Sequence, residues 1–160
     1  MFKVVVVFDS YSGFTEKMAD VVVEGARSVK NVEVDLLKWG TPFSIAMLNE
    51  ADAIILGSPV IYGGISTEMK SFLNIIQELV VSRRLSLTGK IGSAFGSYTF
   101  SGDWVIRELS EKMEALGIRI VAPAVSVVDG MGRQQPIRLH ETTRQKCFEF
   151  GRTIAEHIGR

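Results

Sequence analysis

The sequence has little of what disulfide-bonded or metal-binding proteins need. Cys147 is the only cysteine, and His140 and His157 are the only histidines, among 160 residues. A single cysteine cannot close an intrachain disulfide, and two histidines so far apart in the sequence do not give the spacing of metal ligands. These absences favour a reducing compartment, so we expect a cytoplasmic protein without a dedicated metal site.

Long apolar runs and an excess of one charge are also absent. The run Val4–Phe8 is too short for the core of a signal peptide, and no uncharged run approaches the roughly 18 residues of a membrane span. Lys and Arg number 18, as do Asp and Glu, so the formal net charge is zero. The sequence therefore predicts neither secretion nor a membrane span, and it argues against dedicated nucleic-acid binding, which needs a basic excess.

What the sequence does contain is an alternation of apolar strands and amphipathic helices. Five strands are expected, at 4–8, 32–36, 53–56, 91–95 and 118–128, the last interrupted at Pro123. Apolar residues at three- and four-residue spacing predict helices at about 15–29, 69–79, 105–116 and 136–158. Residues 1–160 are thus expected to form a single α/β domain, a parallel sheet with helices on both faces.

Three polar loops follow the first, third and fourth expected strands. They run from Asp9 to Thr15, from Gly57 to Gly64 and from Gly96 to Gly102, and all are rich in glycine, hydroxyl and aromatic residues. Ligands of open α/β sheets bind at the carboxyl ends of the strands. We therefore expect these loops to converge on a binding site.

The first loop has the features of an anion site. It places Ser10, Ser12 and Thr15 around Gly13 at the start of a helix, where unpaired N–H groups and the helix dipole favour negative charge. Equally, Ser10 or Ser12 can be an ordinary helix cap, and the residues alone leave both interpretations open. The loop lacks Gly-x-Gly-x-x-Gly and the chain lacks Gly-x-x-x-x-Gly-Lys, which excludes a dinucleotide fingerprint and a P-loop.

Ser10, Ser12, Gly13 and Thr15 resemble the phosphate loop of the flavodoxin family, whose pattern is hydroxyl, any residue, hydroxyl, glycine, any residue, threonine. In residues 9–19, 57–59, 94–98 and 101–102, the chain most closely resembles the flavodoxin domain of flavo-diiron proteins, and it resembles flavodoxin-like quinone reductases less closely. The resemblance covers nearly the whole chain. It implies FMN and a flavodoxin-like three-layer fold with strand order 2-1-3-4-5, but not diiron chemistry, because no diiron domain is present.

The resemblance implies that the three loops hold FMN. A flat isoalloxazine ring needs apolar or aromatic walls and nearby backbone amides. The expected contacts are Ser10, Tyr11, Ser12, Gly13, Phe14 and Thr15 from the first loop, Ser58, Pro59, Val60, Ile61, Tyr62, Gly63 and Gly64 from the second, and Gly96, Ser97, Tyr98, Thr99, Phe100, Ser101 and Gly102 from the third. No side chain is expected to be catalytic, because the flavin carries the redox chemistry.

Other polar residues near these loops receive structural roles. Asp103 starts a helix, Asp129 precedes Gly130 in a turn, and Asp9 ends the first strand. Cys147 lies on the apolar stripe of the last helix, as a buried structural thiol does. A phosphorylated receiver domain is excluded because Gly57 and Ser58 stand where its acidic residue would be.

The resemblance implies an electron carrier that shuttles between a reductase and an acceptor. An NAD(P)H-dependent FMN reductase acting on quinones is the alternative, and a flavin-free interaction domain is a third hypothesis. Because the net charge is zero, docking is expected to use apolar contacts of Ile61, Tyr62, Tyr98 and Phe100. A basic face made by Arg133, Arg138, Arg144 and Lys146 is the other possibility.

Overall fold

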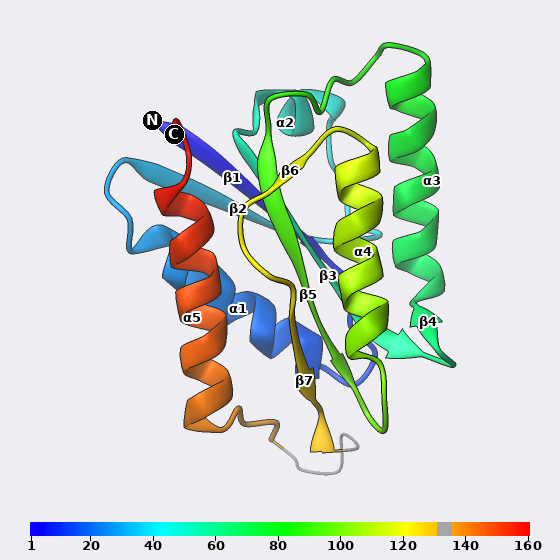
Figure 1. The fold of residues 1–160 in the computed structure, drawn as a ribbon, viewed down its shortest axis with the longest axis vertical. Helices are drawn as coiled ribbons and strands as arrows, with labels where there is room; N and C mark the ends of the chain where they lie inside the picture. Colours follow the sequence, from blue (N-terminus) through cyan, green and yellow to red (C-terminus); the bar gives the residue numbers. More distant parts are fainter. Residues whose placement is uncertain (131–135) are drawn as a thin grey trace.

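The computed structural model describes residues 1–130 and 136–160, so Arg133 of the expected basic face lies outside the described residues. Figure 1 shows a twisted sheet with helices on both of its faces, and the two termini side by side at one end. The expected three-layer α/β flavodoxin-like fold is confirmed.

The sheet has a parallel core flanked by short additions. Its strands are β1 (Phe2–Phe8), β2 (Val32–Lys38), β3 (Ala53–Ile61), β4 (Gly64–Ile65), β5 (Ile91–Tyr98), β6 (Arg119–Ile120) and β7 (Val125–Val128). The order is β2-β1-β3-β5-β6, with β7 also paired to β5 and β4 forming an antiparallel hairpin with β3. The expected five strands become seven because β4 was not predicted and the fifth strand is split around Pro123 into β6 and β7. With that split strand counted once and β4 set aside, the order is the expected 2-1-3-4-5.

Helices α1 (Phe14–Arg27) and α5 (Glu141–Glu156) cover one face of the sheet, and α2 (Ile45–Glu50), α3 (Thr67–Val81) and α4 (Asp103–Ala115) cover the other. Alternate residues of β1 serve the two cores: Val4 and Val6 pack with α1 and α5, Val5 and Val7 with the remaining helices. Gly25 lets α1 and α5 approach closely, since a Cβ there would lie 2.0 Å from the carbonyl oxygen of Phe148.

Strands β3 and β5 run further than expected, and this corrects the predicted loop boundaries. Ser58 pairs with Gly96 and Pro59 with Ser97, so residues 57–61 and 96–98 are strand rather than loop. β1 pairs with β3 only as far as Gly57, and a strand with a neighbour on one side tolerates a proline. The short helix α2, capped by the Ser44 hydroxyl, was also not predicted.

Candidate functional site

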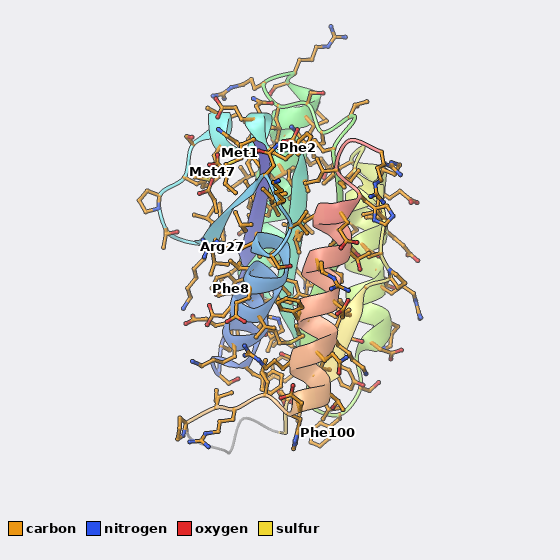
Figure 2. All side chains as sticks on the ribbon, turned by 90° about the vertical axis from the view of Figure 1, so that its left-hand side faces the viewer. Met1, Phe2, Phe8, Arg27, Met47 and Phe100 are labelled. Carbon is orange, nitrogen blue, oxygen red and sulfur yellow. The ribbon has the colours of Figure 1, made fainter. Side chains whose placement is uncertain are left out.

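A cleft of about 690 Å³ opens at the carboxyl end of the sheet, where the three loops meet. Its lining consists of Tyr11, Val60, Ile61, Tyr62, Gly63, Thr99, Phe100, Ser101 and Trp104. None of these lining residues is charged, and four are aromatic. Figure 2 shows Phe100 at the end of the molecule opposite Met1 and Phe2. The structure thus brings together parts of all three predicted loops.

The first loop forms the N-terminus of α1 with its hydroxyls turned onto backbone N–H groups. Gly13 is the N-cap with a left-handed φ of 99°, and it has no side chain to cap the helix. The Ser10 hydroxyl accepts hydrogen bonds from the N–H groups of Gly13 (3.1 Å) and Glu16 (3.3 Å), and the Ser12 hydroxyl accepts from Phe14 (3.3 Å). In these bonds both hydroxyls are acceptors, so each keeps its own O–H for donation to a ligand.

Phe14 and Thr15 are anchored in the core rather than exposed in the loop. Phe14, the first residue of α1, is buried in the core between α1 and the sheet, and the Thr15 side chain is 1% exposed. The hydroxyl oxygens of Thr15 and Ser97 lie 2.9 Å apart. This buried contact fixes the first turn of α1 to the end of β5, and thereby the first predicted loop to the third.

The second loop is a tight hairpin between β3 and β4. Val60 pairs with Ile65, and the turn residues Tyr62 and Gly63 have φ values of 48° and 73°. Two consecutive positive φ angles are what a two-residue hairpin turn of type I′ requires. A tyrosine in this conformation is strained, and its fully exposed ring gains nothing from burial in return. Such strain in an exposed loop is typical of functional positions.

Hydroxyl groups tie this hairpin to α3. The fully buried Ser58 hydroxyl donates to the Pro59 carbonyl (2.8 Å) and accepts from the Ser66 N–H (3.0 Å). Ser66 is the N-cap of α3, and its hydroxyl accepts from the Met69 N–H at 3.1 Å. Ser58, a predicted cofactor contact, therefore has its hydroxyl engaged within the protein.

An acidic pair lies between the first loop and α3. The Tyr11 hydroxyl donates to Oε2 of Glu68 at 2.8 Å, and this bond is the main cause that lowers the pKa of Glu68. Asp9 is 5% exposed, and burial raises the pKa of its carboxyl, with Glu68 adding to the shift. The structural role expected for Asp9 does not account for a buried carboxyl group in this position.

A family model described as flavodoxin matches residues 6–149. The chain belongs to the flavodoxin family. Flavodoxins are FMN-binding proteins, and FMN is accordingly the cofactor of this chain.

Curated relatives extend over most of the chain. The type A flavoprotein fprA of Rhodobacter capsulatus is 30% identical over 152 residues, which are 91% of this chain and 31% of that protein. An NAD(P)H dehydrogenase (quinone) of Trichlorobacter lovleyi is 32% identical over 120 residues, 61% of this chain and 58% of that protein. The chain thus spans about a third and somewhat over half of these two relatives.

Solved structures share the fold over nearly the full chain. A flavodoxin from the domain Archaea is 32% identical with a TM-score of 0.82, and the match covers 99% of this chain and all of that one. The flavodiiron core Flv1 of Synechocystis has a TM-score of 0.79 at 20% identity, covering 98% of this chain and 36% of that one. The expected membership of the flavodoxin family is confirmed, and the likeness to the Flv1 core shows a shared fold.

The donor set of the first loop fits the phosphate group of FMN. An anion at a helix N-terminus is stabilised by backbone N–H groups and by the helix dipole, and here Ser10 and Ser12 add hydroxyl donors. A side chain at Gly13 would be strained at its φ and would lie 3.2 Å from Ile137. The aromatic, uncharged cleft in turn fits the flat isoalloxazine ring.

Some predicted contacts do not line the cleft of this flavodoxin. The half-buried Tyr98 ends β5, and Gly96 serves strand packing, since a Cβ there would lie 2.2 Å from the Ser58 carbonyl oxygen. Conversely, Trp104 lines the cleft and was not predicted. It lies two residues after the third loop and outside the apolar stripe of α4. A large aromatic residue at such a position was the signal that the sequence offered.

Asp129 and Cys147, which were expected to have structural roles, are both held within the fold. The N–H of Asp129 donates to the Tyr98 carbonyl (2.9 Å) and its Oδ2 accepts from the Thr99 hydroxyl (3.2 Å), which fixes the third loop beside β7. Cys147 is fully buried, and burial raises the pKa of its thiol to about 12. Within 1–130 and 136–160, no helix is long and apolar enough to cross a membrane, and no group of three His, Cys, Asp or Glu residues could hold a metal ion.

Proposed function

We propose that this chain is a cytoplasmic electron carrier that receives electrons from a reductase and passes them to an acceptor protein. The observation that carries the proposal is the convergence of three loops on one uncharged, aromatic cleft beside an anion-binding helix N-terminus. When bound, FMN supplies one- and two-electron redox chemistry. The protein has to hold the cofactor, shield it and leave an edge accessible to partners.

The described residues divide this work between the loops. Ser10, Ser12 and the amides around Gly13 would hold the phosphate, while Tyr62, Phe100 and Trp104 would border the ring. Six further residues do not need to touch the cofactor with their side chains. They would contact it through their backbone atoms or only hold neighbouring residues in place: Ser58, Pro59, Gly64, Gly96, Ser97 and Gly102. An electron carrier needs no catalytic acid or base, and the residues that line the cleft are uncharged.

Docking through apolar contacts is supported by the exposure of the cleft rim. Tyr62 is fully exposed and Phe100 is 86% exposed, and both belong to the cleft lining. The alternative basic face is weaker than expected, because Arg144 is engaged with Glu24 at 2.7 Å. Partners with an apolar contact surface are therefore favoured over strongly acidic ones.

A second candidate is an NAD(P)H-dependent FMN reductase for quinones, favoured by the similarity to an NAD(P)H dehydrogenase (quinone). A pyridine dinucleotide carries phosphate groups, which Arg and Lys side chains commonly bind. No Lys or Arg lines the described cleft, which favours the carrier.

Two measurements on the purified protein test these functions. The carrier and the reductase both require a flavin absorption spectrum, with FMN as the extracted flavin, whereas a colourless protein that takes up no FMN would contradict both. Anaerobic mixing with NADH or NADPH then separates the two. The carrier stays oxidised over many minutes until a reductase is added, and rapid bleaching by the nucleotide alone would establish the reductase.

A further inference from the structure

A buried carboxyl group directly precedes the phosphate loop, and the proposed function does not use it. Oδ2 of Asp9 has no hydrogen-bond partner among the residues that the structure describes, although the side chain is 5% exposed. Burying a charged carboxylate without compensating hydrogen bonds is costly, and such a group holds its proton instead. Burial is accordingly the largest cause that raises the pKa of Asp9.

The groups around Asp9 increase this preference for the neutral form. Glu68, on the first turn of α3, repels a charge on Asp9, whereas Ser66 and the backbone of Ser10 lower the pKa of Asp9 without reversing the net rise. No Lys or Arg is among the groups that shift the pKa of Asp9.

The nearby cations have other contacts. Lys38, on β2, lies 3.7 Å from Glu16, and Lys70, on α3, lies 3.4 Å from the position of a Cβ on Gly64. Neither lysine is among the groups that shift the pKa of Asp9 or of Glu68.

Glu68 is the member of the pair that carries the charge. The hydrogen bond from the Tyr11 hydroxyl is the largest cause that lowers the pKa of Glu68, and the neighbouring Asp9 lowers it further. A neutral Asp9 can donate a hydrogen bond to a charged Glu68. The raised pKa of Asp9 and the lowered pKa of Glu68 therefore both correspond to a pair that shares a single proton. Tyr11 itself lies between the phosphate-binding Ser10 and Ser12.

The pair of Asp9 and Glu68 therefore lies where the phosphate loop is joined to α3. The Tyr11–Glu68 bond links residues 57 positions apart, connecting the phosphate loop to α3. The N-cap of α3, Ser66, is in turn bonded to Ser58 of the strand that leads into the hairpin. Repulsion at this point would disturb the loop that is proposed to hold the phosphate.

We infer that Asp9, Tyr11 and Glu68 form a proton-dependent clamp that positions the phosphate loop for FMN. With Asp9 protonated, Tyr11 and Asp9 both bond to Glu68 and the loop is held against α3. When Asp9 ionises, two carboxylates face each other, the loop loosens and FMN binds more weakly. All three are positioning residues, and the inference rests on the proposed FMN site.

The direction of the pH dependence follows from the raised pKa of Asp9. Between the usual range of an aspartate and this raised value, the folded protein binds a proton that the unfolded chain does not, so its stability falls as pH rises. FMN affinity should fall in the same direction as pH passes the pKa of Asp9. One linked proton gives at most about a tenfold change in Kd for each pH unit.

The test compares FMN dissociation constants of wild type and Asp9→Asn by fluorescence titration from pH 5 to 9. Titration of the phosphate itself is common to both proteins and cancels in the ratio of their Kd values. The clamp predicts that this ratio, wild type over variant, rises several-fold or more with pH. Asp20→Asn is the matched control, because burial also raises the pKa of this α1 carboxyl and, among the residues that the structure describes, no hydrogen bond joins it to the loop.

A second variant covers the case in which Asp9→Asn does not fold. Glu68 is exposed, so Glu68→Gln should fold normally, and it removes the repulsion that an ionised Asp9 meets. It should flatten the rise of Kd with pH seen in wild type. A pH profile identical to wild type in Asp9→Asn, or in Glu68→Gln if the first is unfolded, overturns the clamp, whereas failure of wild type to bind FMN at any pH overturns the proposed function instead.

Discussion

The two ends of the sheet differ in whether their buried polar groups have hydrogen-bond partners. At the end near the termini, the ammonium group of the buried Lys90 donates to the carbonyl oxygens of Asn49 (2.7 Å) and Ala51 (2.6 Å). At the carboxyl end, Oδ2 of Asp9 has no partner among the described residues and Tyr62 adopts a strained turn. The buried ammonium group at one end has its hydrogen-bond partners, whereas the carboxyl end leaves a buried carboxyl oxygen without one, as sites prepared for a ligand do.

The largest effect is expected from the end that has no role in binding. Lys90→Met keeps the apolar stem but removes the donor to two carbonyl groups, which should destabilise the protein by about 3 kcal/mol. Urea unfolding measures this loss, and FMN affinity at low urea should stay at the wild-type value. If Lys90→Met had wild-type stability in urea but bound FMN poorly, the assignment of stability to one end and binding to the other would be contradicted.

At the binding end, Ser12→Ala should weaken FMN by about 1.5–3 kcal/mol, the contribution of a hydrogen bond to a charged group. Riboflavin lacks the phosphate, so its affinity should hardly change. Thr15→Ala is a contrasting variant, because Thr15 is buried against Ser97 and its loss should weaken both ligands. Equal losses for FMN and riboflavin in Ser12→Ala would remove Ser12 from the phosphate site.

The strain in the hairpin can be tested by relieving it. Tyr62→Gly should stabilise the FMN-free protein by about 1 kcal/mol, because glycine adopts a positive φ without the penalty of a Cβ. Thermal unfolding measures this gain. The same variant should bind FMN less tightly, since it removes a ring that borders the cleft, and unchanged stability would show that the turn is not strained.

Gly63 and Gly64 form a matched pair for the redox role of this hairpin. Only Gly63 has a positive φ, and a Cβ there would meet nothing within 4 Å, so Gly63→Ala changes backbone preference alone. It should alter the separation between the two one-electron potentials of the bound cofactor in a reductive titration, while Gly64→Ala should alter it less. The opposite ranking would assign the redox effect to Gly64.

The smallest effect is expected from salt. Screening shortens the range of charge interactions to about 10 Å at 0.1 M, so a carrier of zero net charge should lose little association rate as salt is added. Stopped-flow reduction by a partner reductase at several ionic strengths measures this. A many-fold loss would favour docking through the basic segment around Arg138 and Arg144.

How much the sequence predicted depends on whether a feature is local. The strands at Val4–Phe8 and Ala53–Leu56 follow from continuous apolar runs, and the helix at Met69 to Leu79 follows from apolar residues at helical spacing. The structure confirms all three. The ends of β3 and β5 were predicted too early, because their glycine, serine and proline residues are held in strands by pairing between distant segments.

The candidate site shows the same limit. The loop residues of the cleft were predicted from glycines, hydroxyls and aromatics next to strands, whereas Glu68 was not, since it matters only through a bond to Tyr11 from another part of the chain. In sequence it is an ordinary acidic residue in the first turn of a helix. Pairs of this kind are fixed by tertiary structure and leave no local pattern.

Hydrogen exchange of the FMN-free protein, with and without added FMN, tests the central claim most directly. The account predicts that FMN slows exchange at the amides of 10–15, 61–64 and 99–102, the three loops at the carboxyl end, and leaves the amides around Lys90 unchanged. Protection confined to other segments, or no protection at saturating FMN, would contradict it.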